Sequence, residues 1–256
     1  MRPRVILVAF LLALSPLSAR AEFSLAAGLE YFHWEESSTP SVTESGPRAF
    51  GELAYTMDRD SGLLFAYRGR LYAGVVDYDG ALLISGTPVT STTSYFGMSN
   101  EAQGRFRFRL QGTGYADLVT ALGVDAWRRE LSADQREDYT IGFARLGLEA
   151  GSHAARGWVI GGGVKYPFYR RENAHLDDIG ATSNPTLEPG ASVSFYARLE
   201  YGITEHWRIM AYYDSFRFDQ SPLVSTTAPA FGPGTIQFFQ PKSSLDVYGI
   251  GALYRF

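Results

Sequence analysis

The sequence predicts an all-β fold, a single antiparallel transmembrane β-barrel of ten strands, and three observations lead to this prediction. Apolar and polar residues alternate along ten segments, and short and long connections between the segments alternate strictly. The chain also ends on an alternating segment whose last residue is aromatic. Because successive side chains of a strand point to opposite faces, this alternation gives each segment one apolar and one polar face.

The connections between the expected strands differ in length on the two sides of the barrel. Four are tight and contain Gly, Asp and Ser, which supply the backbone angles of hairpin turns. A meander with short periplasmic turns, five long extracellular loops and an even strand number is typical of membrane barrels, whereas a soluble sandwich shows Greek-key irregularity. The expected strands lie near 23–34, 47–58, 62–78, 98–111, 114–129, 138–151, 156–171, 190–203, 206–219 and 243–256, and the long loops near 35–46, 79–97, 130–137, 172–189 and 220–242.

Residue parity assigns the two faces of each expected strand. A charged side chain that faces lipid at mid-bilayer costs roughly 2–4 kcal/mol, so the charged parity must face the lumen. The segment 138–151 breaks phase between Phe143 and Leu146, which predicts a bulge there or a different register. Residues expected to face lipid on three strands are Phe106, Phe108, Leu110, Trp158, Ile160, Val164, Tyr166, Phe168, Val193, Phe195, Ala197, Leu199 and Tyr201.

The C-terminal segment carries the most informative pattern of the chain. Phe256, Tyr254 and Tyr248 share one parity, while Arg255 and Gly249 take the other. A strand of this kind that ends on Phe resembles the closing strand of bacterial outer-membrane β-barrels. The resemblance implies that Tyr254 and Phe256 form the signal read by the barrel-assembly machinery. It also implies a place in the outer membrane of a Gram-negative cell envelope.

The N-terminus has the features of an export signal. Arg2 and Arg4 precede an apolar run from Val5 to Leu14, and a small-x-small cleavage site follows near Ala21. The run is too short to cross a bilayer as a helix, so we expect cleavage there. Residues 1–21 are then a signal peptide and residues 22–256 form one outer-membrane β-barrel domain.

The composition excludes several kinds of site and partner. The chain has no Cys, so it forms no disulfide and no thiolate metal site. Its net charge of −4 provides no basic footprint for nucleic acid. No His is spaced like a metal ligand, so we expect no metal and no cofactor. The expected partners are outer-membrane lipid and lipopolysaccharide, the assembly machinery, and an extracellular ligand or host surface.

The charged parity predicts a lumen filled with ion pairs. Buried charges persist only when they are paired and hydrogen-bonded. Ten strands enclose little more space than the eight that side chains can fill, far less than an open porin encloses. We therefore expect an occluded interior. The expected inward residues are Glu30, Glu52, Arg68, Arg70, Arg105, Arg107, Arg109, Asp117, Asp125, Lys165, Arg198, Glu200, Arg208 and Asp214.

Two segments at the expected barrel mouth are candidates for chemistry. Val76-Asp77-Tyr78-Asp79-Gly80 leads into the second long loop, and Asn173-Ala174-His175-Leu176-Asp177-Asp178 lies in the fourth. Here the chain resembles the omptins, ten-stranded outer-membrane endopeptidases. Their second loop carries a Val-Asp-x-Asp segment and their fourth an Asp-x-His pair.

The omptin resemblance implies a role for individual residues. Asp77, Asp79 and His175 would flank a water that attacks the peptide bond, since such chemistry needs a base and a group that orients it. Asn173 stands where the family has Asp, so Asp177 on the other side of His175 is the candidate substitute. This chain lacks the family's longer Trp-rich and Gly-rich signatures.

Parity gives a second interpretation of the acidic pair. Asp77 and Asp79 share the parity of Phe65 and Val75, which is the lipid side. From Phe65 to Asp77 the strand rises about 28 Å at a 45° tilt, just beyond the apolar band, where outward carboxylates are tolerated. The pair then belongs to an acidic junction between strand and loop, and reaches the lumen only if the strand end bulges.

The top of the fifth expected strand carries Trp127, Arg128 and Arg129. Arg binds phosphates with two parallel hydrogen bonds and Trp prefers membrane interfaces. These residues are candidates for lipopolysaccharide contact, with ordinary anchoring in the aromatic girdle as the alternative. The loop 220–242, rich in Pro and Phe, is either a binding surface or a lid over the mouth.

Three functions remain open on the sequence. The leading hypothesis is a non-enzymatic barrel with an occluded charged lumen, used for surface contact, adhesion or envelope stability. The alternatives are an omptin-like endopeptidase that activates water with Asp and His, and a narrow channel for small solutes. The sequence leaves ligand, substrate and oligomeric state open.

Overall fold

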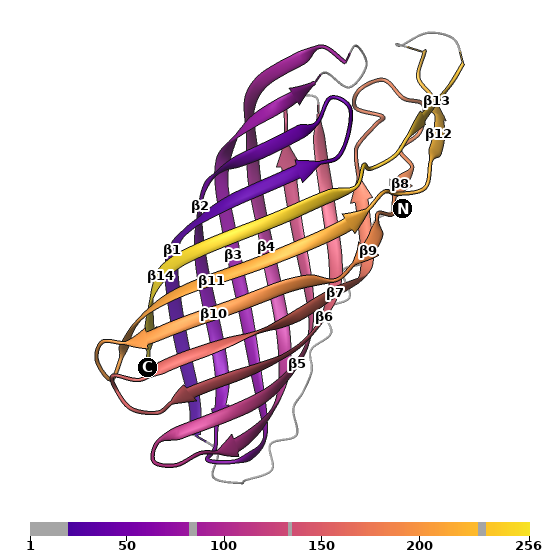
Figure 1. The fold of residues 1–256 in the computed structure, drawn as a ribbon. Helices are drawn as coiled ribbons and strands as arrows, with labels where there is room; N and C mark the ends of the chain where they lie inside the picture. The colour runs from indigo at the N-terminus through magenta and orange to yellow at the C-terminus, as the bar shows by residue number, and fades with distance from the viewer. Residues whose placement is uncertain (1–19, 82–85, 133–134, 230–233) are drawn as a thin grey trace.

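A computed structural model of the chain describes residues 20–81, 86–132, 135–229 and 234–256, and in it ten long antiparallel strands close into a barrel (Figure 1). The strand β1 (Arg20–Glu36) pairs with β14 (Ser243–Arg255), so the barrel has no free edge. The predicted fold class is confirmed. The other barrel strands are β2 (Val42–Asp58), β3 (Gly62–Ala81), β4 (Pro88–Arg109), β5 (Gly114–Glu130), β6 (Arg136–Ser152), β7 (Trp158–Asn173), β10 (Ser194–Gly202) and β11 (Trp207–Asp219).

The expected signal peptide is almost wholly outside the described ranges. Arg20 and Ala21 are its described residues, and they begin β1. Within the described ranges there is no helix with the length and apolar character needed to span a bilayer.

The two faces of the strands follow the predicted parity. On β4, Phe106 and Phe108 are 46% and 54% exposed on the outer surface, while Arg105 and Arg107, which alternate with them, are buried. Trp158 and Ile160 on β7, Phe195 on β10 and Val193 just before β10 are likewise exposed outward. An apolar band therefore surrounds a polar interior, as a barrel in lipid requires.

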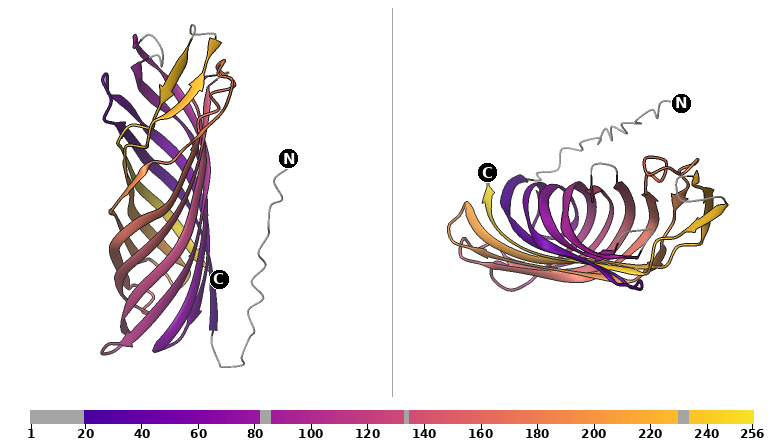
Figure 2. Two further views of the ribbon diagram at one scale, coloured as in Figure 1. Left: turned by 90° about the vertical axis from the view of Figure 1, so that its right-hand side faces the viewer. Right: turned by 90° about the horizontal axis from the view of Figure 1, so that it is seen from above.

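The strands extend much further than predicted on the long-loop side. β4 begins at Pro88 rather than near 98, so the connection expected at 79–97 shrinks. With 22 residues, β4 is about twice as long as the 9–11 residues that cross a bilayer. Its first part is rich in Thr and Ser, which suit strands but show no apolar alternation. Figure 2 shows the resulting tall, inclined barrel.

The predicted irregularity in the sixth strand lies in its pairing with β7. Gly142 pairs with Tyr169 and Phe143 pairs with Pro167, so Phe168 is the extra residue and it lies on β7. Phe143 is buried in the lumen, on the same face of β6 as Arg145. The expectation of a break between Phe143 and Leu146 is corrected accordingly, because β6 keeps its phase and β7 bulges.

The two last long loops pack together above the barrel. They contain the short strand β8 (Thr186–Leu187), which pairs with β7, and the hairpin of β12 (Val224–Thr227) and β13 (Thr235–Phe238) (Figure 1). The short strand β9 (Gly190–Ser192) pairs with β11 in the barrel wall. A second apolar cluster, separate from the barrel core, holds the two loops together. We call the residues 174–187, 221–229 and 234–240 the loop module.

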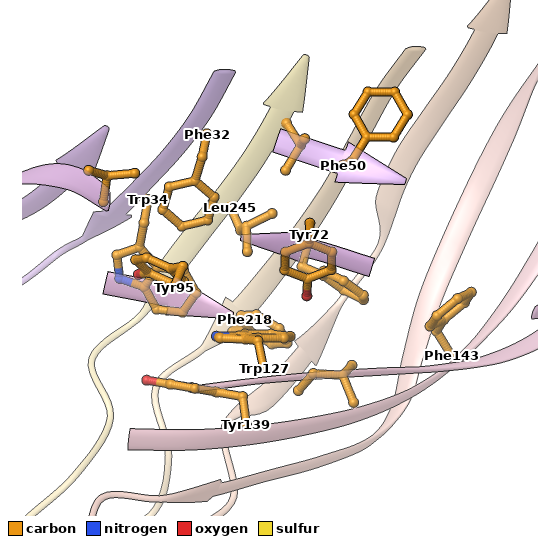
Figure 3. Close-up of a cluster of buried hydrophobic side chains, with 14 of the residues drawn as sticks. Phe32, Trp34, Phe50, Tyr72, Tyr95, Trp127, Tyr139, Phe143, Phe218 and Leu245 are labelled. Atoms are coloured by element: carbon orange, nitrogen blue, oxygen red, sulfur yellow. The ribbon is translucent and has the colours of Figure 1, made fainter. Parts of the chain in front are cut away.

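The upper lumen is filled by aromatic side chains (Figure 3). Trp127 and Tyr139 stack with their ring centroids 4.9 Å apart, and Trp34 meets Tyr139 edge-on at 5.7 Å. We call this set the aromatic layer; it comprises Phe32, Trp34, Phe50, Tyr72, Tyr95, Trp127, Tyr139, Phe143, Phe216 and Phe218.

Candidate functional site

The lumen contains the ionic network that the charged parity predicts. Arg48 donates to Glu30 over 2.9 Å, and Lys165 donates to Asp214 over 2.6 Å. Because each charge has an opposite partner, the cost of removing it from water is offset. The expected residues that line the lumen are Glu30, Glu52, Arg68, Arg70, Arg105, Arg107, Asp117, Asp125, Lys165, Arg198, Glu200, Arg208 and Asp214.

Arg109 is an exception to the expected network. Its side chain is 66% exposed at the short-turn end of β4, 3.7 Å from Asp60. The residue has the inward parity, but the barrel ends there and the side chain reaches solvent.

Below the barrel mouth, sequence reasoning missed the charged lumen residues Arg48, Glu101, Arg145 and Glu149. Arg145 pairs with Glu101 at 2.9 Å and with Asp214 at 2.7 Å. Arg48 has the parity of Glu52, so alternation alone would have found it. Arg145 was hidden by the apparent phase break in the sixth strand.

The expected lipopolysaccharide contact is wrong for two of its three residues. Trp127 and Arg129 are only 4% and 3% exposed and lie inside the barrel, in the aromatic layer and just above it. Arg128 points outward and pairs with Asp138 at 2.8 Å. The parity of Asp125, which faces the lumen, extends to Trp127 and Arg129, and it would have predicted this arrangement.

Arg129 is the centre of an acidic group at the barrel mouth. Its guanidinium lies 2.9 Å from carboxylate oxygens of both Glu44 and Glu137, and 3.1 Å from Glu36. Glu172 on β7 lies beside these groups and is 1% exposed. We call Glu36, Glu44, Arg129, Glu137 and Glu172 the mouth cluster.

Tyrosine, tryptophan and threonine side chains complete the mouth cluster. The Tyr139 hydroxyl donates to Glu137 over 3.1 Å and Trp34 Nε1 donates to Glu36 over 2.9 Å. Tyr95 and Thr93 donate to Glu44. Trp34, Tyr95 and Tyr139 belong to the aromatic layer, so the mouth cluster is in direct contact with that layer.

The mouth cluster lies above the membrane-spanning part of the strands. Arg128 and Asp138, which neighbour Arg129 and Glu137 on the outer surface, are charged and partly exposed. Burial raises the pKa of Glu172 well above its usual range, and the neighbouring Glu137 raises it further. Burial likewise raises the pKa of Glu137, against the opposing effect of Arg129. In both carboxyls, burial stabilises the protonated form relative to the ionised one.

The omptin-like residues are not brought together. Asp77 and Asp79 are exposed on the outer face of β3, as the second interpretation of their parity predicts. His175 and Asp177 follow β7, and β4, β5 and β6 lie between β3 and β7. Asp177 is exposed in a turn, where its carbonyl accepts from Gly180.

His175 is held by other acidic residues. Its Nε2 lies 2.8 Å from Asp138 and its Nδ1 lies 3.9 Å from Asp178, with Arg136 3.2 Å from Asp178. Although partial burial opposes it, hydrogen bonds from Arg128 and His175 lower the pKa of Asp138. This network attaches the fourth long loop to the outside of β6.

Free space inside the barrel is divided into small cavities. Two have volumes of about 70 Å³ each and a third, within the aromatic layer, about 10 Å³. A water molecule occupies about 30 Å³ in the liquid, so the larger cavities hold a few waters each. In the described ranges no group of three or more His, Asp or Glu side chains is arranged to hold a metal ion.

Comparisons with known proteins support the fold. No protein-family model and no curated protein matches the sequence. The outer-membrane protease OmpT of Escherichia coli aligns over 94% of this chain and 99% of its own, with a TM-score of 0.56 and 11% identity. Neisserial surface protein A covers 91% of this chain and 97% of its own (TM-score 0.39, 10% identity). The translocator domain of the autotransporter NalP from Neisseria meningitidis covers 91% and 88% (TM-score 0.40, 12% identity).

The alignment with OmpT has a TM-score above 0.5 and spans nearly all of both chains, so it describes a shared fold. At this identity it does not extend to activity. It agrees with the apolar outer band and the closed ladder of strands. The chain has the fold of a ten-stranded outer-membrane β-barrel.

Proposed function

We propose that this protein is a non-enzymatic, non-conducting barrel that presents the loop module to extracellular surfaces. The observation that carries the proposal is the second apolar cluster, which orders two long loops above the barrel mouth. A packed apolar cluster fixes the conformation of the two loops. A fixed conformation favours a surface that binds a partner, because less conformational entropy is lost on binding.

The loop module is held by contacts between distant parts of the chain. Leu176 and Leu187 of the fourth loop pack with Ala228 of the fifth, and all three are buried. The Thr182 amide donates to the carbonyl of Thr227 over 2.7 Å. Pre-organisation of this kind reduces the entropy lost on binding a partner.

The outer surface of the loop module offers both apolar and hydroxyl groups. Leu223 and Phe239 are 55% and 41% exposed at the base of the hairpin. Thr227 and Thr235, which pair at the other end of the hairpin, are also exposed. Exposed aromatic and aliphatic groups rimmed by polar ones are typical of sites that bind another macromolecule.

The channel alternative is weakened by the closed lumen and the endopeptidase alternative by the separation of Asp77 and Asp79 from His175. We retain one test for the endopeptidase, because Asp138, the partner of His175, borders an open polar pocket of about 390 Å³. The refolded protein in vesicles containing lipopolysaccharide should leave basic peptides uncleaved. Cleavage that Asp138→Asn abolishes would replace the proposal with an enzyme.

The proposed function is tested by adhesion of bacteria that display the protein. Cells displaying the native chain should be retained on immobilised basement-membrane matrix several-fold more than cells displaying a variant in which 224–238 are replaced by a Gly-Ser linker. The control variant Asp60→Asn changes an exposed residue at the opposite end and should bind like the native chain. Equal retention of the native chain and the linker variant would refute the surface-contact role.

A further inference from the structure

Asn100 places a carboxamide on the lipid-facing surface of the barrel. It lies on β4, between β3 and β5 in the wall (Figure 1), and has the outward parity of Met98 and Phe106. Those two side chains are 47% and 46% exposed. Across the strands Asn100 pairs with Gly69 and with Val124, and Val124 is 48% exposed. The amide therefore lies among apolar groups of the outer surface.

The depth of Asn100 in the membrane follows from charged residues on either side of it. Arg128 on β5 faces outward opposite Phe96, four residues from Asn100 toward the long loops. Arg109, exposed at the short-turn end of β4, is nine residues away in the other direction. At a strand tilt of about 45° these separations correspond to depths of about 10 Å and about 21 Å. Their sum is close to the ~30 Å thickness of the hydrocarbon core, so the amide lies inside it.

The amide of Asn100 is only partly satisfied within its own chain. The Tyr67 hydroxyl donates to Oδ1 over 2.6 Å. Within the described parts of the chain, no group accepts a hydrogen bond from Nδ2. If the amide were turned over, Nδ2 would donate one hydrogen to Tyr67 and Oδ1 would face lipid, so a donor and an acceptor remain free in either orientation. A polar group left without a partner in hydrocarbon is costly.

Small residues surround Asn100 on the outer face. Gly69 lies beside it on β3, and Ala102 and Gly104 follow it on the same face of β4. A Cβ at Gly69 would lie 3.0 Å from the Tyr67 hydroxyl oxygen, so the glycine leaves the room that the Tyr67 side chain occupies. Because these positions carry little or no side chain, the backbone of another membrane protein can approach the amide closely.

We propose that the protein forms a dimer in the membrane in which the Asn100 amides of two copies bond each other. Nδ2 of each amide donates to Oδ1 of the other, and the second lone pair of each Oδ1 accepts from Tyr67 of the same chain. Both copies point their long loops to the same side of the membrane, so the two-fold axis is parallel to the membrane normal. The pair of hydrogen bonds satisfies the donor that a single barrel leaves unused.

A second copy is the occupant that the chemistry and the geometry favour. An acyl chain has no donor or acceptor, so lipid leaves the amide unsatisfied. A different protein would need a matching polar group at the same depth, whereas a second copy has one there by symmetry. Strands tilted by about 35–45° cross their symmetry mates at roughly 70–90°, so the contact is centred on one position of each β4 and Asn100 fixes which position.

The dimer carries two loop modules on the same side of the membrane. Its formation does not depend on which surface the loop module contacts, so the inference goes beyond the proposed function. Two linked modules would bind a repetitive surface with higher avidity than one.

Energy transfer between labelled copies tests the dimer in lipid. The chain has no Cys, so Asp60→Cys, at a position whose side chain is 85% exposed, accepts a single fluorophore. Refolded full-length protein carrying donor or acceptor is mixed in phosphatidylcholine vesicles, and the lipid-to-protein ratio is varied to separate association from random encounter. The native chain should show transfer above the random level, and excess unlabelled native protein should abolish it.

One variant and a matched control separate the amide from the rest of the surface. Asn100→Leu removes the amide and should weaken the association about tenfold, which corresponds to about 1.4 kcal/mol. The variant is more apolar on its lipid side, so it should fold as the native chain does, as judged by heat-modifiable migration on a gel. In the control Thr120→Val the lost hydroxyl donates to the Gly104 carbonyl over 3.2 Å within the chain. The control should associate like the native chain.

Distances between spin labels on the two copies identify the contacting wall. Thr92 on β4 and Asp219 on β11 are exposed, and β11 is five strands from β4 in either direction around the barrel. With one label on each chain, pulsed electron spin resonance should give a short and narrow distance distribution for Thr92→Cys. Asp219→Cys, on the opposite wall, should give a longer distance.

Three results would overturn the proposal. One is energy transfer in the native chain that stays at the random level at every lipid-to-protein ratio, as expected if lipid or another protein covers Asn100. Another is a folded Asn100→Leu variant that associates as strongly as the native chain. The third is a distance for Thr92→Cys that is no shorter than the distance for Asp219→Cys. Adhesion is measured separately, so failure of the dimer leaves the proposed surface role standing.

Discussion

At the residue scale, Arg129 shows how one side chain organises a site. It lies 3.1 Å or less from three carboxylates contributed by β1, β2 and β6, and the glutamates of β1 and β2 are 93 and 85 positions away in the sequence. A sequence pattern reveals the parity of each of these glutamates but not that they meet. The strand tilt and stagger that bring them to one level are properties of the closed barrel.

Replacing Arg129 by Leu should destabilise the barrel strongly at neutral pH. Removing one partner of a buried ion pair typically costs about 3–5 kcal/mol, because the other charges remain buried without compensation. The loss should shrink in acidic medium, where the carboxyls are neutral. Urea unfolding of the refolded protein in vesicles at both pH values measures it. Arg128→Leu, an exposed neighbour, should cost less than about 1 kcal/mol, and an equal loss in the two variants would contradict the burial of Arg129.

At the element scale, the alternation of each strand predicted its lipid side and its lumen side. The prediction succeeded where apolar residues occupy one parity without interruption, as on β4 and β10. The prediction failed where the strands extend beyond the bilayer. Both faces of a strand carry polar residues there, so apolar and polar residues no longer alternate. It also failed at the bulge of β7, where Phe168 and Tyr169 both face outward.

A charge on the outer face should discriminate the bilayer segment of a strand from its extension. Leu122 on β5 is 63% exposed in the apolar band, and Leu122→Arg should cost roughly 2–4 kcal/mol in vesicles. Thr92 on the extended part of β4 is also exposed on the outer face, but beyond the apolar band, so the cost of Thr92→Arg should be close to zero. Equal unfolding free energies for the two variants would place the bilayer elsewhere on the barrel.

We expect the barrel-assembly machinery to recognise the C-terminal strand through the side chain of its last residue, Phe256. Phe256 is 73% exposed, although its amide donates to the Phe23 carbonyl across the barrel seam. Phe256→Ala should lower the amount of folded barrel in cells several-fold while refolding in vitro proceeds as before. The heat-modifiable band on a gel measures both. Parallel losses in cells and in vitro would mean that the side chain acts in folding rather than as a signal.

At the scale of the whole molecule, the closure of the barrel explains why the sequence predicts a filled lumen. It also explains why the sequence does not predict how the filling is arranged. A ten-stranded barrel is narrow enough for side chains to fill, which alternation and strand number together predict. The sequence did not predict that the filling has three levels, with ion pairs below, the aromatic layer above them and the mouth cluster at the top. Nor did it predict the loop module, because the contacts of Leu176 with residues of the fifth loop cross some fifty positions and follow no periodic pattern.

The single-channel conductance of the refolded protein in planar bilayers is the most direct test of this account. We propose that the three stacked levels of side chains, with cavities of about 70 Å³ or less between them, close the lumen, so the native barrel should show no steady conductance. Stable, ohmic current steps that recur with each insertion would contradict the occluded lumen.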